Sequence, residues 1–165
     1  MSLKTTEQQT AYLEAIYELD QDVRNFETEQ MEKYGYNSPE HQQSILRIME
    51  IDKNHLAKIE AYFAAYGHPK KDIHGKSACG VPWLVIHHAP SETAPRRRNF
   101  PTIYRAYKDG DITDTDITFY LNRMHENELG YRIQWEGAYR VDQELDTLFR
   151  ALDIQGIVSK IDAEQ

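Results

Sequence analysis

The stretch "YGYNSPE", residues 34–40, separates two long amphipathic segments and decides how the chain begins to fold. Gly35 is suited to end a helix, and Pro39 is suited to the first turn of the next one. Asn37 or Ser38 can provide the N-cap of that second helix. The stretch therefore predicts a tight connection between two helices, which is the start of a helical hairpin.

The segments on both sides of this connection have the apolar spacing of amphipathic helices. Steps of four and three residues place one apolar stripe along a helix from about residue 5 to 34, and a second along residues 39–66. In the second stripe Asp52 takes a position where an apolar residue is expected, and His55 is its neighbour on the helix surface. The stripes consist of Tyr12, Ile16, Leu19, Val23 and Phe26 in the first segment, and Ile45, Met49, Asp52, Leu56, Ile59, Phe63 and Tyr66 in the second.

The rest of the chain continues the helical pattern. The stretch "VPWLVIHHAP", residues 81–90, is interpreted as a third helix, because Pro82 suits a first helical turn and fits an interior strand badly. Three more amphipathic segments follow, at about residues 100–107, 113–130 and 141–154. The sequence therefore predicts an all-α fold of about six helices, in which a long N-terminal helical hairpin packs on a smaller helical bundle within one domain of residues 1–165.

The composition is that of a folded, soluble and acidic protein. Of the 165 residues, 40% are hydrophobic and 28% are charged, and the formal net charge is -8. This charge opposes binding to nucleic acids and to anionic membranes, and the basic run Arg96-Arg97-Arg98 is expected to be a solvated face. No apolar run approaches the roughly 20 residues that a membrane span needs.

The chain carries no recognisable targeting signal. Its opening stretch is polar, and Cys79 is the single cysteine, so the sequence predicts neither a signal peptide nor a disulfide framework. The opening Met-Ser-Leu is typical of recombinant sequences, in which a natural leader is often omitted. A cytoplasmic location is therefore expected only by default.

The sequence lacks the best-known catalytic and cofactor motifs. It has no glycine-rich phosphate loop, no dinucleotide fingerprint, no G-x-S-x-G elbow and no H-E-x-x-H pair. His87 and His88 point about 100° apart on a helix, so they would rarely share one metal ion. A site assembled across helices from His88, Asp52 and His55 is the alternative, but the spacing of these residues gives it no support. We predict neither a metal nor a cofactor.

Two charged residues fall on or beside predicted apolar faces and therefore need partners. Asp52 lies between Met49 and Leu56, and Arg123 borders the inward face of its helix. Because an unpaired buried charge is far too costly to persist, we expect Asp52 to pair with Arg123 or with His88. Such a pair either fixes the helix register as a buried salt bridge or lines a polar pocket that binds a ligand.

Residues 49–124 contain an ordered series of motifs. The stretch "MEIDKNHLAKIEAYFAAYGHP…IHG" is followed by "WLVIHHAP", by a helix with an inner proline and by a helix that carries an arginine. In this order the segment resembles a bacterial domain-of-unknown-function family, the one numbered 6624. The residues that fit the family pattern are Asp52, Gly67, Pro69, Gly75, Trp83, His88, Ala89, Pro101, Asp116 and Arg123.

The resemblance implies a bacterial source and places Asp52, His88 and Arg123 in one constellation. It supplies no reaction, because the family has none assigned. The chain also departs from the family pattern, so an activity of the family need not be retained here. The departures are His55 for an Asn, His87 for a Gln, Pro90 for an Asp and Asn122 for an Asp.

Three functions are compatible with these residues. The favoured hypothesis is a module that binds a small molecule or a protein partner through a polar pocket around His88. The first alternative is an acid–base hydrolase or lyase in which His88 is the general base, Asp52 orients it and Arg123 holds an anionic group. The second alternative is a purely structural helical protein, and the oligomeric state is left open. The candidates for ligand binding are Trp83, His87, His88, His55, Tyr120 and Arg123.

Overall fold

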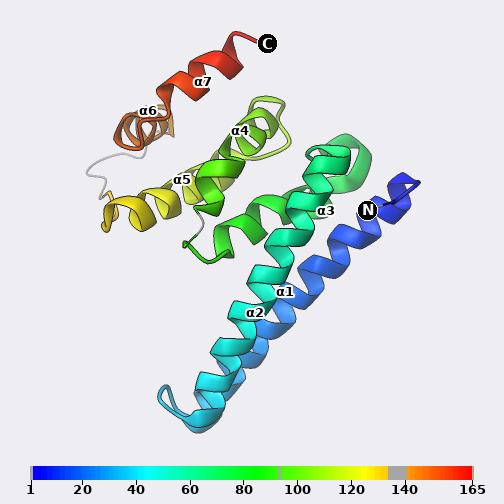
Figure 1. The fold of residues 1–165 in the computed structure, drawn as a ribbon, viewed down its shortest axis with the longest axis vertical. Helices are drawn as coiled ribbons and strands as arrows, with labels where there is room; N and C mark the ends of the chain where they lie inside the picture. The colour runs from blue at the N-terminus through cyan, green and yellow to red at the C-terminus, as the bar shows by residue number, and fades with distance from the viewer. Residues whose placement is uncertain (1, 93, 134–140, 165) are drawn as a thin grey trace. The chain divides into compact units, whose positions relative to one another are not determined.

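A computed structural model describes residues 2–92, 94–133 and 141–164 of the chain. Within these residues the structure is helical and contains no strand (Figure 1). The predicted all-α class is therefore confirmed, whereas the count of six helices is wrong, because the described residues form seven. The helices are α1 (Thr6–Tyr34), α2 (Pro39–Tyr66), α3 (Lys71–His88), α4 (Pro95–Lys108), α5 (Asp114–Leu129), α6 (Val141–Ala151) and α7 (Gln155–Asp162).

The helices divide into two compact units. Unit 1 comprises residues 1–90 and holds α1, α2 and α3, and unit 2 comprises residues 91–165 and holds α4 to α7. In the described ranges, no helix has both the length and the apolar character that crossing a membrane requires. The single domain expected over residues 1–165 stays a prediction.

The connection between α1 and α2 forms as its sequence predicts. Gly35 ends α1 with φ at 93°, a value that glycine adopts without strain, and its N–H donates to the Met31 carbonyl at 2.9 Å. Ser38 caps α2, because its hydroxyl accepts a hydrogen bond from the His41 N–H at 3.1 Å, and Pro39 occupies the first turn. The predicted boundaries of both helices at this connection are confirmed.

Polar contacts join the two helices next to this connection. His41 is fully buried, and its Nε2 lies 2.5 Å from Oε1 of Glu27. Its Nδ1 donates to the backbone carbonyl of Tyr36. Met49, which the apolar spacing placed inward, is instead 50% exposed, because α3, the third helix of unit 1, packs on the other half of the hairpin. The outer half of the hairpin therefore leaves apolar side chains open to solvent.

The core of unit 1 lies where α3 joins the hairpin. α1 packs against both α2 and α3, and α2 also contacts α3 (Figure 1). A helix between two neighbours buries a different face from a helix with one neighbour, so the buried stripe of α1 is shifted from the predicted one. It consists of Leu13, Ile16, Asp20 and Val23.

The third helix starts earlier than its proline suggests. α3 begins at Lys71, and Gly75 interrupts it with φ at 82° and ψ at 161°, a conformation that favours glycine. Pro82 is therefore a buried residue in the helix interior, and the prediction that it lies in a first turn is wrong. Because proline has no N–H, the carbonyl of Ala78 lacks its usual helical partner at this point.

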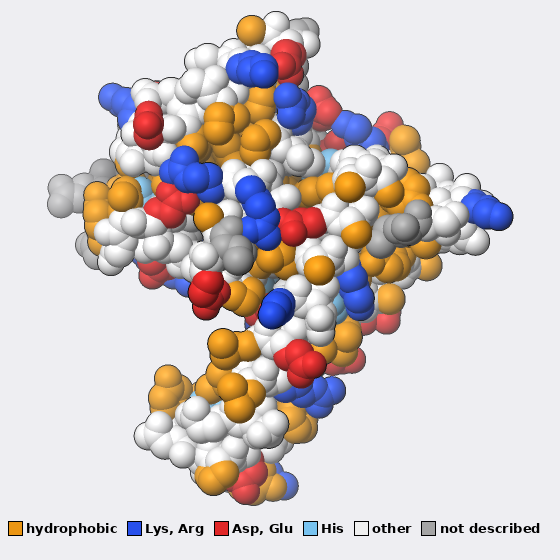
Figure 2. Space-filling model, in the orientation of Figure 1, with side chains coloured by type: hydrophobic (Ala, Val, Ile, Leu, Met, Phe, Trp, Pro, Cys, Tyr) orange, Lys and Arg blue, Asp and Glu red, His pale blue; other side chains and the backbone are white. Residues whose placement is uncertain are grey.

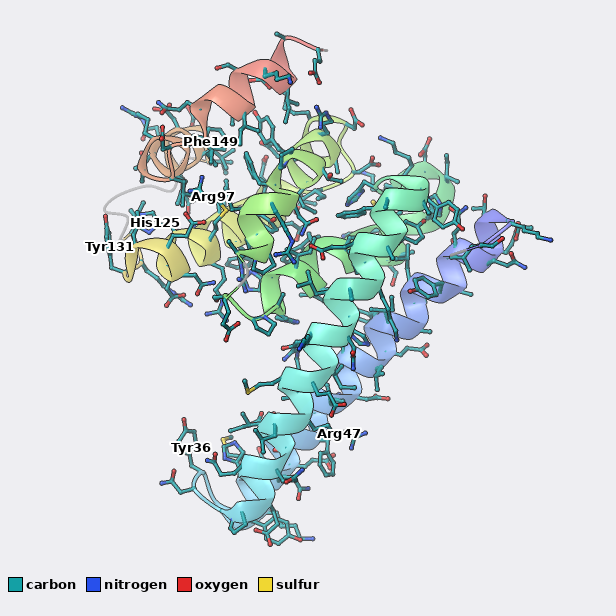
Figure 3. All side chains as sticks on the ribbon, in the orientation of Figure 1. Tyr36, Arg47, Arg97, His125, Tyr131 and Phe149 are labelled. Atoms are coloured by element: carbon teal, nitrogen blue, oxygen red, sulfur yellow. The ribbon has the colours of Figure 1, made fainter. Side chains whose placement is uncertain are left out.

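Unit 2 is a smaller helical bundle in which Arg97 joins several elements. α4 packs against α5 and α7, and α6 contacts α5 and α7. The Arg97 guanidinium lies 2.5 Å from Oε2 of Glu128 and donates to the Leu152 carbonyl at 2.7 Å (Figure 3). Arg96 is only 4% exposed, because it shares a helix face with the buried Phe100, so the expectation of a solvated basic face is wrong for this residue.

The last predicted segment contains two helices. α6 ends at Ala151 and α7 begins at Gln155, and between them Asp153 has φ at 51°. Aspartate tolerates this left-handed conformation better than most residues with a side chain. Because neither glycine nor proline marks the break, the apolar spacing runs through it, and the sequence predicted one helix over residues 141–154.

The start of α5 provides a test of the local signals. The Thr113 hydroxyl accepts from the Asp116 N–H at 3.2 Å, and the Asp116 carboxylate accepts from the Thr113 N–H at 3.2 Å. Thr113→Ala should lower the free energy of unfolding by about 1 kcal/mol in urea denaturation, because the Asp116 N–H loses the hydroxyl that accepts its hydrogen bond. Thr115→Ala, at an exposed position of the same turn, is the control and should change it by less than about 0.5 kcal/mol. Equal losses in the two variants would contradict the role of the cap.

Candidate functional site

Three helices of unit 1 bring four ionisable side chains together. We call Asp20 and Arg24 of α1, Asp52 of α2 and His88 of α3 the Asp20 cluster. Nη2 of Arg24 lies 3.1 Å from Oδ1 of Asp20 and 2.6 Å from Oδ1 of Asp52. Nδ1 of His88 lies 3.2 Å from the same Oδ1 of Asp20. The cluster therefore connects all three helices through ion pairs and hydrogen bonds.

Asp20 is the centre of the cluster. It is fully buried, and it accepts hydrogen bonds from Gln21, Arg24 and His88. Burial alone would raise the pKa of Asp20, but the hydrogen bonds and charges of His88 and Arg24 outweigh burial and hold the pKa at about 2. Asp20 is therefore an ionised acceptor throughout the neutral pH range.

Asp52 has the opposite electrostatic balance. Its burial raises the pKa of the carboxyl above the usual range, and the neighbouring Asp20 adds to this effect. The charges of Arg24 and His88 oppose the increase but do not cancel it. Arg24 thus lies between two carboxylates whose pKa values move in opposite directions.

A hydrogen bond to Asp20 fixes the orientation of the His88 ring and occupies one of its two nitrogens, Nδ1. An ionised carboxylate can only accept a hydrogen bond, so Nδ1 of His88 carries the proton that it donates to Asp20. In the neutral ring Nε2 is then an acceptor, and it makes no hydrogen bond to any described residue. The His88 side chain is 19% exposed, so solvent reaches the ring. This arrangement can accept a proton or a hydrogen bond from a bound molecule.

His55 is a buried polar group beside the cluster. It is 1% exposed, and neither of its ring nitrogens has a hydrogen-bond partner among the described residues. Burial lowers the pKa of His55, the positive charges of Lys58 and Arg24 lower it further, and only Asp20 opposes the shift. The neutral ring keeps one donor and one acceptor available, which is uncommon for a buried side chain.

The other two candidates in unit 1 lie on α3 near His88. The ring centroid of Trp83 is 5.9 Å from that of His87, and the His87 centroid is 5.6 Å from that of His88, both with edge-on geometry. His87 and His88 are therefore in ring contact but point in different directions, as adjacent residues on a helix do. Trp83 and His87 extend the cluster as an aromatic border.

Two candidates, Tyr120 and Arg123, lie on α5 in unit 2, where each has a partner of its own. The buried Tyr120 hydroxyl donates to the Arg96 carbonyl at 2.5 Å, which makes it a packing residue of that unit. Nη1 of Arg123 lies 3.3 Å from Oε2 of Glu126 on the same helix, and its side chain is partly exposed. The cation that pairs with Asp52 within unit 1 is Arg24. The expected pair of Asp52 with Arg123 would join the two units, and it stays a prediction.

The expected orientation of His88 needs correction. Asp20, not Asp52, accepts the hydrogen bond from Nδ1 of His88, because α1 packs against α3 along the line that contains Asp20. The sequence reasoning missed Asp20 and Arg24. A signal was available, since Asp20 lies at helical spacing from Leu13, Ile16 and Val23. Arg24 follows it by one turn, which is the spacing of a helical ion pair.

The Asp20 cluster carries more negative than positive charge, so it is suited to bind groups that donate hydrogen bonds. Two carboxylates surround one guanidinium, so the ionised cluster has an excess of one negative charge when both histidines are neutral. Among the described residues, no group of three or more His, Cys, Asp or Glu side chains has the arrangement that would hold a metal ion. The geometry offers proton acceptance at His88 and hydrogen bonding at His55.

No family model, no curated protein and no solved structure matches this chain. The resemblance of residues 49–124 to the family numbered 6624 therefore stays a prediction. The function has to be argued from the residues of the cluster and their geometry.

Proposed function

We propose that unit 1 is a ligand-binding module in which the Asp20 cluster and His55 bind a small molecule that carries an amine or another hydrogen-bond donor. The observation that carries the proposal is Nε2 of His88, which has no hydrogen-bond partner among the described residues and whose ring is held by Asp20, with 3.2 Å between His88 Nδ1 and Asp20 Oδ1. The partial exposure of the His88 side chain gives a ligand access to this acceptor. A ligand that donates to Nε2 would make a hydrogen bond that none of the side chains in the described ranges makes.

The charges of the cluster favour a positive ligand over a negative one. An ammonium group would meet the negative excess of Asp20 and Asp52, which Arg24 compensates only in part. A carboxylate or phosphate ligand would instead approach two buried acids, and the Arg24 guanidinium that would receive it is already paired with both of them. The acidic net charge of the whole chain acts in the same direction.

The buried His55 gives the site a second polar contact. Its two nitrogens lack partners among the described residues, and an unmet hydrogen-bonding group costs folding free energy unless a ligand or a water meets it. A ligand that reaches both histidines would therefore gain one hydrogen bond at the exposed end and one at the buried end. This proposal assigns His55 a binding role that its burial alone would not explain.

Binding of matched probes tests this proposal. Ethanolamine, acetate and ethylene glycol have similar sizes and differ in charge. We expect ethanolamine to shift the His88 side-chain resonances in ¹⁵N NMR spectra, and acetate to leave them unchanged. His88→Gln should weaken ethanolamine binding about tenfold or more, because the flexible glutamine amide has no basic nitrogen and does not hold its oxygen where the ring holds Nε2.

A matched histidine substitution controls for effects on folding. His74 also lies on α3, where its Nε2 is 3.0 Å from Oε1 of Gln9, outside the Asp20 cluster. His74→Gln should bind ethanolamine as the original chain does. Equal binding of ethanolamine by the His88→Gln and original chains would overturn the proposal, as would preferential binding of acetate.

The pair of Asp20 and His88 also favours a second function, that of an acid–base enzyme. A carboxylate that fixes Nδ1 of a histidine leaves Nε2 as a general base, the arrangement that hydrolases and lyases use. In that case Asp20 is the positioning residue and Arg24 holds Asp20. Turnover of a hydrolase or lyase substrate that falls about 10²–10⁴-fold in His88→Gln would support this function. If His88→Gln changes neither turnover, ethanolamine binding nor stability, the purely structural interpretation is favoured.

A further inference from the structure

A groove runs along the outer half of the hairpin, away from the Asp20 cluster. It lies between α1 and α2 and has a volume of about 760 Å³. Phe26 of α1 borders it, and α2 contributes Glu40, Gln43, Leu46 and Arg47. Its position and residues are independent of the proposed ligand site, so it requires an explanation of its own.

The outer half of the hairpin exposes several large apolar side chains. Of the ten large hydrophobic side chains that are exposed among the described residues, five lie within residues 26–49. Figure 2 shows hydrophobic side chains gathered on the outer end of the hairpin. Two of the five, Phe26 and Leu46, line the groove, and exposed apolar side chains in a groove favour the binding of another molecule. The five are Phe26, Tyr34, Tyr36, Leu46 and Met49.

An acidic and a basic side chain lie along the groove on the same face of α2. Glu40, Gln43 and Arg47 follow one another at steps of three and four, so they share one face of α2. Glu40 and Arg47 are two helical turns apart, roughly 10 Å along the axis. The Arg47 guanidinium lies over the Phe26 ring, 5.6 Å from its centroid, on the outer half of the hairpin (Figure 3).

This order of charges is self-complementary. If two copies of α2 pack antiparallel about a two-fold axis near Gln43, Glu40 of each copy faces Arg47 of the other copy, and the pairing occurs twice. Leu46 and Phe26 then lie between the charged pairs, where they would be covered. We propose that the groove is a homodimer interface, and that its occupant is the α2 helix of a second copy of this chain.

The same residues argue against other occupants and other registers. A nucleic acid or an anionic membrane would approach Glu40 and Glu50, which flank the groove, in a chain with a net charge of -8. An antiparallel register centred near Ile45 would place Glu40 opposite Glu50, which is repulsive. A register centred near Gln43 gives two attractive pairs close to the middle of the groove.

Sedimentation velocity of charge-reversed variants tests the interface. The original chain should dimerise. Arg47→Glu and Glu40→Arg should each weaken self-association about tenfold or more, because each places like charges opposite one another twice. A mixture of the two variants should restore the dimer as a heterodimer, since each variant then supplies the charges that the other lacks. The double variant E40R/R47E should dimerise alone.

A charge reversal elsewhere on α2 controls for net charge. Lys53 is exposed and does not border the groove, so Lys53→Glu changes the charge as Arg47→Glu does and should leave the dimer intact. Circular dichroism reports whether each variant is folded. A chain that stays monomeric at all concentrations would overturn the proposal. A dimer that resists both single reversals, or a mixture that stays monomeric, would also overturn it.

Discussion

Arg24→Leu should lower the free energy of unfolding by about 3 kcal/mol at pH 7. The substitution leaves the carboxylates of Asp20 and Asp52 in a largely buried site without the guanidinium that lies 3.1 Å and 2.6 Å from them. Uncompensated buried charge is among the few causes of large losses from a single substitution. Urea denaturation followed by circular dichroism measures the loss.

The pH dependence of this variant separates charge from packing. The lowered pKa of Asp20, about 2, means that its ionisation stabilises the original fold above roughly pH 4 and that this contribution is lost as the pH falls toward 2. Without Arg24, both acids bind protons more readily in the folded state. The loss of unfolding free energy in Arg24→Leu, relative to the original chain, should therefore become smaller as the pH falls from 7 to 3.

A control substitution of the same type gives the baseline for this experiment. Arg150 pairs with Asp146 on α6, and both side chains are 61% exposed. Arg150→Leu should change the free energy of unfolding by less than about 1 kcal/mol, as exposed ion pairs do. If Arg24→Leu costs no more than Arg150→Leu, the Asp20 cluster does not hold the three helices together.

His55→Leu should raise the free energy of unfolding by about 1–3 kcal/mol at pH 7. The two ring nitrogens of His55 are buried and have no partner among the described residues, so leucine removes unmet polar atoms and keeps a side chain of similar size. The same variant should lose the buried contact to the proposed ligand. In this one variant the unfolding temperature should therefore rise while the affinity for ethanolamine falls.

As the pH falls, the gain in unfolding free energy of His55→Leu over the original chain should increase. The pKa of His55 is lowered in the folded protein, so below roughly pH 6.5 the unfolded chain binds a proton that the folded chain does not. The original protein therefore loses stability from this residue as the pH falls, and the leucine variant does not. If the difference in unfolding free energy between the two chains stays constant from pH 8 to pH 5, His55 does not take up a proton on unfolding. If His55→Leu is less stable than the original chain, the ring nitrogens of His55 have hydrogen-bond partners in the folded protein.

The local signals for helix ends predicted much of the fold. Gly35, Ser38 and Pro39 set the ends of α1 and α2, and Thr113 set the start of α5. These signals act within one turn of the chain, where sequence and structure are most closely coupled. The break at Asp153 had no such signal, because an aspartate there adopts a conformation that glycine usually supplies.

The partners of the charged residues were harder to predict. The position of Asp52 on an apolar stripe correctly indicated that it needed a partner, but the sequence did not contain the information that selects Arg24. That choice depends on which face of α1 meets α2, and α1 turned out to pack against two helices. For the same reason Met49 had the right spacing for the core and yet is exposed, since α3, the third helix of unit 1, packs on the other half of the hairpin.

The Asp20 cluster also limits the order in which this sequence can change during evolution. Loss of Arg24 leaves two acids uncompensated, whereas loss of Asp20 leaves His88 without its orienting acceptor. Single steps away from the cluster are therefore costly, while simultaneous replacement by apolar side chains of similar volume is close to neutral for stability. Lineages should keep the four residues together or lose them together, and a set of homologous sequences would reveal them as covarying positions.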